Sequence, residues 1–243
     1  AVIGFATVAL IAYAVPHLPA DPTRTVRSEL SALTSVQVWL TLGVGAVGFG
    51  GIFAMYSYIA PTVTEVTGLP ASAVPIFLLV YGVSGLIGNI VAGRMGDWSV
   101  IRSIVIGLAG IGVALGVFAA VASYAVAALV VLAPISVLAS VLVINLQLRL
   151  MQVAGSAQTL AAASNHAALN LANALGAWLG GLVIAAGFGY RAPSVVGVGL
   201  AALGLVILGI SLLIHRRDHP GRVSIRPGGP SGRDASSSVA QVS

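Results

Sequence analysis

The sequence contains no cysteine and no lysine, and only 7% of its 243 residues are charged. The absence of cysteine excludes disulfide bonds and thiolate metal sites. The scarcity of charge excludes a water-soluble globular protein, in which about a quarter of the residues are charged. By contrast, 58% of the residues are hydrophobic and the mean hydropathy is +1.05. These values together indicate a membrane protein.

Histidine and arginine, which could suggest metal or nucleic-acid binding, are dispersed along the chain. His215 and His219 fall in a basic tail and His17 in a loop, so no buried histidine pair has zinc-site spacing. The arginines are divided among loops and do not cluster with aromatic residues, which argues against nucleic-acid binding. Ser164 and His166 are too close in sequence to face each other on a helix. We therefore predict no metal site, no catalytic residues and no enzyme activity.

Long uncharged runs dominate the sequence. A bilayer core about 30 Å thick requires roughly 20 apolar residues in a helix. The first of the candidate runs is short and begins without Met or a basic flank, so we interpret it as the end of a truncated helix rather than a signal peptide. The fold prediction is an all-α polytopic membrane protein with seven runs, at residues 1–15, 36–60, 72–93, 103–122, 125–148, 157–188 and 194–214.

The arginines also predict the orientation of these spans, because arginine near span ends is retained on the cytoplasmic side. When the seven runs cross the membrane in alternating directions, only Arg191 lies on the outer side. The C-terminus and the corner at residues 94–102 are then cytoplasmic, in the cell inner (plasma) membrane. Residues 16–35 form a cytoplasmic loop, and residues 216–243 have too little apolar content to pack, which predicts a disordered basic tail. The other ten arginines lie on the cytoplasmic side: Arg24, Arg27, Arg94, Arg102, Arg149, Arg216, Arg217, Arg222, Arg226 and Arg233.

Small residues recur at four-residue intervals inside two spans, for example at Ala172, Gly176 and Gly180. Such stripes let helix backbones approach closely in a membrane. Two interpretations stay open, namely ordinary helix packing and a seam along which helices move.

His166, Asn170 and Asn173 follow i, i+4, i+7 spacing and so share one helix face. Polar groups are costly in hydrocarbon, so this face should point into protein or into a wet cavity. At 1.5 Å per residue His166 lies about 15 Å deep, where it could exchange protons or make an interhelical hydrogen bond.

Two tyrosines and one asparagine complete the polar candidates in the spans. Tyr56 and Tyr81 are candidates to line a ligand cavity, although Tyr56 approaches the outer face, where aromatic belt residues are common. Asn145, near the inner end of its span, is interpreted as a partner for a neighbouring backbone. The spans contain no Asp or Glu, so a coupling carboxylate would have to lie elsewhere.

Charge is concentrated at a glycine-rich corner between two apolar runs, GNIVAGRMGDWSVIR. Gly93 and Gly96 would permit a tight turn, and Asp97 offers a carboxylate to a helix N-terminus or an arginine. Arg94 and Arg102 add positive charge on the cytoplasmic side. From the residues alone, a plain orienting loop competes with a functional motif.

The corner resembles a known family. Its Gly-Arg-Met-Gly-Asp, at residues 93–97, followed by Arg102, resembles the second, relaxed copy of the cytoplasmic G-x-L-x-D-R-x-G-R motif of the major facilitator superfamily, with Trp98 and Val100 departing from the pattern. MYSYIAPTVTEVTGLP and LNLANALGAWLGGLVIAAGFGYRAP are similar to the seventh and eleventh helices of drug:proton antiporters of the arabinose and chloramphenicol efflux permease type.

The resemblance implies the C-terminal half of a twelve-helix transporter. Residues 36–215 would form the six-helix half-bundle, and residues 1–15 the end of the preceding helix. It further implies export of small drug-like or sugar-like molecules by alternating access, as in efflux and drug resistance, with the proton as coupling ion and no other cofactor. The implied partners are the missing N-terminal half, the lipid bilayer and a small-molecule substrate, and the corner would be a gating contact. The fragment alone would be inactive. A seven-helix receptor or sensor is the alternative.

Overall fold

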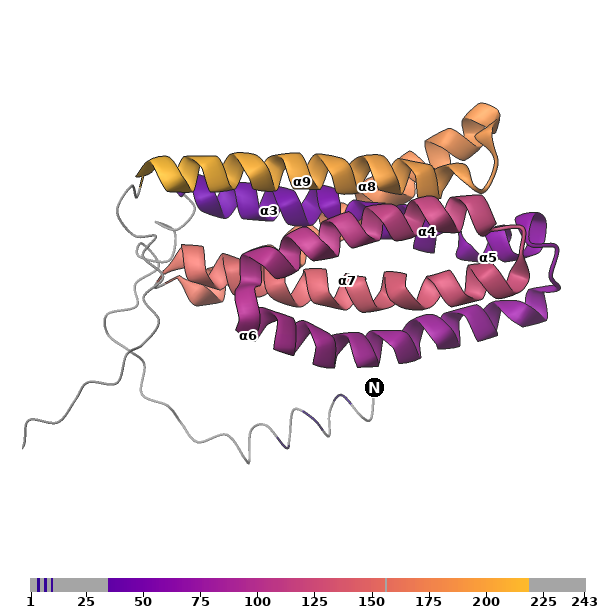
Figure 1. Ribbon diagram of the computed structural model, residues 1–243, viewed down its shortest axis with the longest axis horizontal. Helices are drawn as coiled ribbons and strands as arrows, with labels where there is room; N and C mark the ends of the chain where they lie inside the picture. The colour runs from indigo at the N-terminus through magenta and orange to yellow at the C-terminus, as the bar shows by residue number, and fades with distance from the viewer. Residues whose placement is uncertain (1–3, 5–6, 8–9, 11–34, 156, 219–243) are drawn as a thin grey trace, which may run out of the picture.

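The computed structural model describes residues 35–155 and 157–218, together with Gly4, Thr7 and Leu10. The predicted truncated span apart from these three residues, almost all of the predicted central loop and most of the predicted tail therefore lie outside the described residues. Every regular element in the described part is helical, which confirms the predicted fold class. The elements, labelled as in Figure 1, are α3 (Val36–Gly48), α4 (Gly50–Tyr56), α5 (Ile59–Pro61), η2 (Thr62–Val66), η3 (Ala71–Ala73), α6 (Val74–Val121), α7 (Ala125–Ala154), α8 (Gln158–Val183), η4 (Ile184–Phe188) and α9 (Ala192–Asp218).

Five stretches of the described residues are long and apolar enough to cross a membrane. One of them, Ala71–Val121, has 51 residues and folds back on itself, because Ser99 in α6 has the extended dihedrals φ −173° and ψ 113°. Each half of α6 is long enough for one crossing, so the described bundle contains the six crossings predicted for residues 36–215. Helices suit these apolar runs because a helix satisfies its backbone hydrogen bonds internally, which lipid requires.

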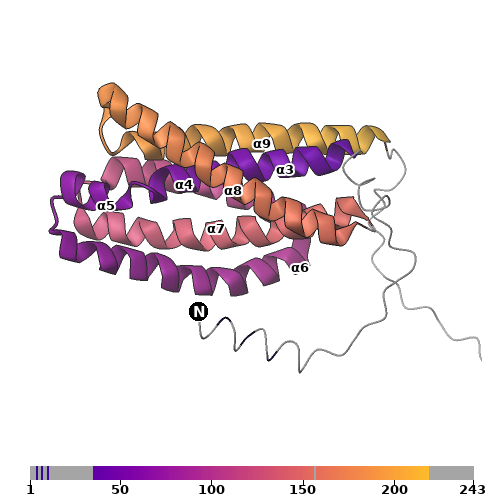
Figure 2. The ribbon, with the colours of Figure 1, turned by 180° about the vertical axis from the view of Figure 1, so that it is seen from behind.

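The six crossings form two faces. Figure 1 shows α9 and the second half of α6 on the near side, and Figure 2 shows α8 running obliquely across α3 and α4 on the other side. Helix α8 packs on α3 and α4, whereas both halves of α6 contact α7. The fold of α6 at Ser99, the start of α3 and the end of α9 lie at one end of the bundle, which we call the corner end. The opposite end, with α5 and η4, is the far end.

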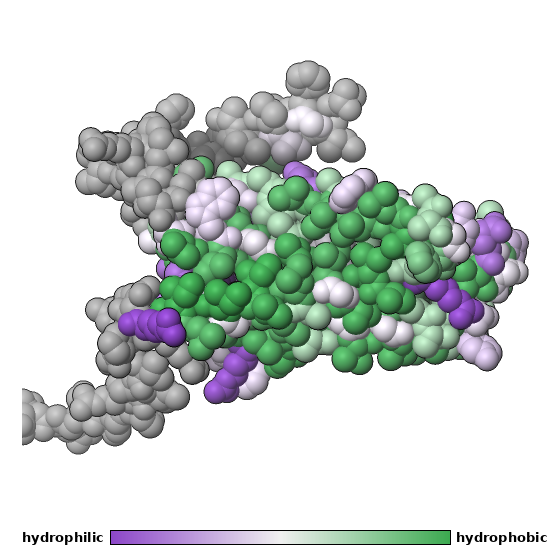
Figure 3. All heavy atoms as spheres, turned by 90° about the horizontal axis from the view of Figure 1, so that it is seen from above, coloured by the Kyte–Doolittle hydropathy of each residue, from purple (hydrophilic) through white to green (hydrophobic). Residues whose placement is uncertain are grey.

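Most of the lateral surface is apolar. Figure 3 shows hydrophobic side chains along the length of the bundle, with most of the hydrophilic ones near its two ends. Large apolar side chains such as Leu86, Val113 and Val126 are 68%, 69% and 75% exposed. Exposed apolar area on this scale requires lipid or another protein as its environment.

Helix α4 lies in backbone contact with α8 and α9. A Cβ atom added at Gly51 would lie 2.5 Å from the carbonyl oxygen of Gly197, and one added at Gly176 would overlap the carbonyl oxygen of Gly50. Ala172, one turn before Gly176, is fully buried. The predicted stripe of small residues in α8 is therefore a packing face, on which only glycine fits at the closest point.

The corner differs from the prediction in how it turns. Gly93 and Gly96 were expected to form the turn, but both are helical and the chain reverses at Ser99. Glycine is unnecessary there because any residue adopts the extended conformation of Ser99. The hydroxyl of Ser103 lies 2.7 Å from the carbonyl oxygens of both Met95 and Ser99 and stabilises the turn. Gly96 instead provides space for Asn145 of α7, since a Cβ atom there would be 3.0 Å from its Oδ1 atom.

Candidate functional site

Helix α8 carries the predicted polar residues on an exposed face. His166, Asn170 and Asn173 are all exposed, whereas Ala168 and Ala172 on the other side of the helix are buried against the bundle. Only 17% of the apolar window of this span is buried, the lowest share among the five candidate spans. The structure thus brings the three residues together as predicted, on a surface that the rest of the described bundle leaves uncovered.

The exposed side of α8 is itself divided. At 100° per residue, Leu171, Trp178 and Leu182 lie along one edge of the exposed arc, and His166 and Asn173 lie along the other. The alanines Ala163, Ala167 and Ala174 lie between the two edges. Lipid suits the apolar edge, but an imidazole and two amides in the hydrocarbon region require a protein or aqueous environment.

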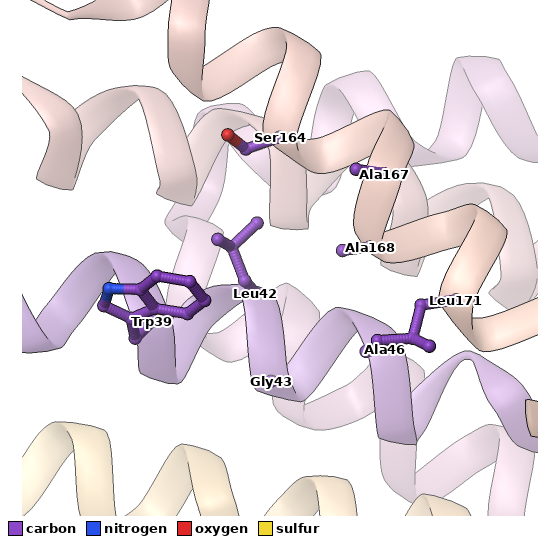
Figure 4. A pocket seen from close by; sticks show the side chains of 8 residues that line it. All are labelled: Trp39, Leu42, Gly43, Ala46, Ser164, Ala167, Ala168 and Leu171. Atoms are coloured by element: carbon purple, nitrogen blue, oxygen red, sulfur yellow. The ribbon is translucent and has the colours of Figure 1, made fainter. Parts of the chain in front are cut away.

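A cavity of about 340 Å³ lies between α3 and α8. Figure 4 shows Trp39 and Leu42 of α3 on one side of this cavity and Ser164 and Leu171 of α8 on the other. Among these side chains the Ser164 hydroxyl and the indole nitrogen of Trp39 are the polar groups. The cavity is therefore suited to apolar groups. His166, Asn170 and Asn173 are not among its lining residues.

A second cavity, of about 230 Å³, lies between the junction of α3 and α4, the first half of α6, and α7. Tyr81 lines it, and the ring of Tyr56 lies against that of Tyr81 with centroids 4.8 Å apart. The structure therefore places Tyr81 on a cavity wall and Tyr56 behind it. The eight residues lining this cavity are Phe49, Tyr81, Gly82, Gly85, Ser136, Ala139, Ser140 and Val143.

Polar side chains of α7 join it to the first half of α6. The Ser136 hydroxyl donates to the carbonyl oxygen of Tyr81, and that of Ser140 donates to the carbonyl oxygen of Gly85 at 3.1 Å. The Asn145 amide donates to the carbonyl oxygen of Ala92 at 3.3 Å, which confirms the prediction that Asn145 binds a neighbouring backbone. The two serines were missed in the sequence. Their signal was the i, i+4 spacing of hydroxyls in an otherwise apolar span.

The charged corner residues project away from the bundle. Arg94, Asp97 and Arg102 are exposed, and within the described residues none of them forms an ion pair. The guanidinium carbon of Arg102 lies 5.2 Å from the ring centroid of Trp98, a cation–π contact. Trp98, which departs from the family pattern, thus holds one of the corner charges in place.

Arg149 corrects a sequence-based expectation. It was assigned to a loop beyond the end of its span, but α7 continues to Ala154 and Arg149 is only 7% exposed. Among the described residues, its Nη2 atom has no hydrogen-bond partner, and neither has the Oδ1 atom of Asn145 one turn earlier. Span ends inferred from charge fail here because the apolar stem of arginine packs like an aliphatic side chain.

The fold is a polytopic helical half-bundle, and α8 carries a polar face that the described bundle leaves uncovered. No protein-family model matches the chain. It is 32% identical over 209 residues to the inner membrane transport protein YdhP of Escherichia coli K12, covering 86% of this chain and 54% of that protein. It is 33% identical over 199 residues to the uncharacterized MFS-type transporter YtbD of Bacillus subtilis, covering 80% of this chain and 50% of YtbD.

A further relative, the putative transporter AraJ of Escherichia coli K12, is 27% identical over 192 residues, which are 79% of this chain and 49% of AraJ. The chain belongs to the major facilitator superfamily and corresponds to the C-terminal half of its members. It spans about half the length of the curated relatives it matches.

Proposed function

We propose that the chain is the C-terminal half of a secondary active transporter, which exports small molecules in exchange for protons by alternating access. The observation that carries this proposal is the exposed face of α8 with His166, Asn170 and Asn173. A second half covering this face would remove it from lipid and enclose a polar path. The relatives are about twice as long as the matched region, which supports the existence of such a half.

In this proposal the corner end faces the cytoplasm. The arginine distribution supports that orientation, because Arg94 and Arg102 lie at the corner end and Arg191 lies beside η4 at the far end. The exposed charges of the corner would then contact the second half in one state of the cycle and separate from it in the other. Outward transport rests on the resemblance to efflux permeases.

His166 is the proposed proton-exchanging group, since histidine changes its charge near physiological pH. Its exposed position on α8 allows a proton to reach it from a cavity between the two halves. Asn170 and Asn173 would contact the substrate or hydrated protons from the same face.

The test uses proteoliposomes that contain the full-length parent protein and a pH gradient. We expect gradient-driven transport in the parent, and a reduction of at least tenfold for His166→Ala. Ala163→Ser, on the neighbouring alanine stripe of α8, is the matched control and should transport normally. Liposomes that contain only the 243-residue chain should show none. Unchanged transport and pH dependence in His166→Ala would remove His166 from the mechanism, and saturable transport by the chain alone would refute the half-transporter proposal.

A further inference from the structure

The walls of the 230 Å³ cavity are aromatic on two sides. Phe49, which is 8% exposed, and Tyr81 both line it. Each ring is backed by another ring, because Phe53 meets Phe49 edge to face at 5.4 Å and Tyr56 lies against Tyr81 at 4.8 Å. Backing of this kind fixes the orientation of the two wall rings. They form a rigid surface suited to another flat aromatic group.

The two serine hydroxyls of the cavity can accept hydrogen bonds but have none left to donate, so the phenolic hydroxyl of Tyr81 is the one side-chain donor among the lining residues. The hydroxyl hydrogens of Ser136 and Ser140 are directed to the carbonyl oxygens of Tyr81 and Gly85, which leaves the serine oxygens with acceptor lone pairs only. Ser136 is 2% exposed, so its hydroxyl is held within the helix pair. No charged side chain is among the eight lining residues.

This lining discriminates between classes of ligand. An anion would find no cation and few donors, and burying a charge without a partner is costly. A sugar would bring many hydroxyls that must each be paired, and the cavity offers too few partners for them. An aromatic ring stacks on Phe49 and Tyr81, and a positive charge on that ring is attracted to their faces.

We propose that this cavity is a binding subsite for the fused aromatic ring of an uncharged or cationic compound, such as an aromatic amine. The proposal rests on the proposed transport function and names the class of its substrate. The volume of about 230 Å³ is below the 300–1,000 Å³ typical of complete ligand sites. The ring system therefore occupies the cavity, and the remainder of a larger substrate extends out of it.

The experiment measures binding of 4-aminoquinoline to the 243-residue chain in lipid nanodiscs by equilibrium dialysis. Empty nanodiscs correct for partition into lipid. Quinoline, which is uncharged at neutral pH, and arabinose are measured in parallel. We expect saturable binding of both aromatic compounds, tighter for the cationic 4-aminoquinoline, and no saturable binding of arabinose.

Gly82→Leu should block the cavity without disturbing the fold. A Cβ atom added at Gly82 meets no atom within 4 Å, so the leucine side chain has space on the cavity wall. We expect at least a tenfold loss of affinity for 4-aminoquinoline. Gly199→Leu is the matched control, because its Cβ atom is equally free and it lies on α9, outside the cavity. It should bind as the unaltered chain does.

Substitutions at Tyr81 separate the ring from its hydroxyl. Tyr81→Phe keeps the aromatic stacking surface and should retain the affinity for 4-aminoquinoline. Tyr81→Leu removes the aromatic ring and should weaken binding about two- to tenfold. The backbone carbonyl that receives the Ser136 hydrogen bond is unchanged in both variants.

Three results would overturn the subsite: no saturable binding beyond that of empty nanodiscs, equal affinity in Gly82→Leu and the unaltered chain, or arabinose binding that Gly82→Leu abolishes. The transport assay of the full-length parent is a separate readout. If the parent transports but this cavity does not bind aromatic compounds, the subsite proposal is refuted and the transport function is not. Binding that Gly82→Leu abolishes, in a parent that does not transport, would support the subsite and refute the transport function.

Discussion

Helices α7 and α8 both carry polar side chains in their spans, and one group on each helix has the opposite environment to the other. Ser136, Ser140 and Asn145 of α7 donate hydrogen bonds to backbone carbonyls of α6. His166, Asn170 and Asn173 of α8 project from the bundle on its exposed face, whereas Asn165 of the same helix is buried. A polar residue in a span therefore has one of two roles. It forms a hydrogen bond to a neighbouring helix of the bundle, or it lies on a surface that requires water or another protein as its environment.

The largest expected effect separates the two sides of α8 itself. Gly176→Leu should lower the free energy of unfolding by about 3 kcal/mol or prevent folding, because the new side chain overlaps the backbone of Gly50. Asn170→Leu on the exposed face should change it by less than about 0.5 kcal/mol. Unfolding by sodium dodecyl sulfate in bicelles measures both. Equal losses in the two variants would show that the exposed face is packed against the bundle.

The comparison between α7 and α8 is sharpened by replacing one asparagine on each. Asn145→Leu removes the amide that donates hydrogen bonds to the carbonyl oxygens of Ala92 and Val141, and it should lower the free energy of unfolding by about 1–2 kcal/mol. Asn173→Leu should cause no measurable loss of unfolding free energy in the same sodium dodecyl sulfate titration. A loss at Asn173 as large as that at Asn145 would break the distinction between the two helices.

A substitution at Arg149 is expected to increase the stability of the bundle, in contrast to those above. Its buried guanidinium has an unpaired Nη2 atom, so Arg149→Leu should raise the free energy of unfolding by about 1 kcal/mol. Arg94→Leu, at an exposed position of the corner, is the control and should leave the stability unchanged. Destabilisation by Arg149→Leu would mean that the guanidinium has a partner in the bilayer.

The smallest effect concerns the serines. Ser140→Ala removes one hydrogen bond to α6 and should lower the free energy of unfolding by about 0.6 kcal/mol. Ser164→Ala on α8 should have no effect, since Ser164 lies beside the apolar cavity. Chemical denaturation of both variants in parallel resolves the difference. A loss in Ser164→Ala that matches the loss in Ser140→Ala would contradict the account.

The sequence was sufficient for the six crossings of residues 36–215 and for the shared face of His166, Asn170 and Asn173, because apolar run length and helical periodicity are local properties. It also indicated that Asn145 binds a backbone. It did not reveal that Ser136 and Ser140 face α6, and it left open whether Tyr81 lines a cavity. Periodicity shows which residues share a face, but the neighbour of that face is a tertiary property.

Two errors have the same physical origin. The turn of the corner was assigned to Gly93 and Gly96, and Arg149 was assigned to a loop, because glycine and charge usually mark the ends of helices. In the structure α6 continues to the extended residue Ser99, and α7 continues to Ala154 before Gly155 adopts a φ of 59°. Glycine in a membrane span also serves close packing, as Gly96 does against Asn145.

The central claim is that the polar face of α8 meets water or protein in the complete transporter, and cysteine accessibility tests it most directly. The chain has no cysteine, so single cysteines can be introduced at His166, Asn170 and Asn173, and at Leu171, Trp178 and Leu182, in a parent whose other half is also cysteine-free. The account predicts that a membrane-impermeant methanethiosulfonate reagent modifies the first three positions and that substrate or transport conditions change their rates, while the last three stay unmodified. Modification of neither set, with all six positions accessible only to lipid-soluble maleimides, would contradict it.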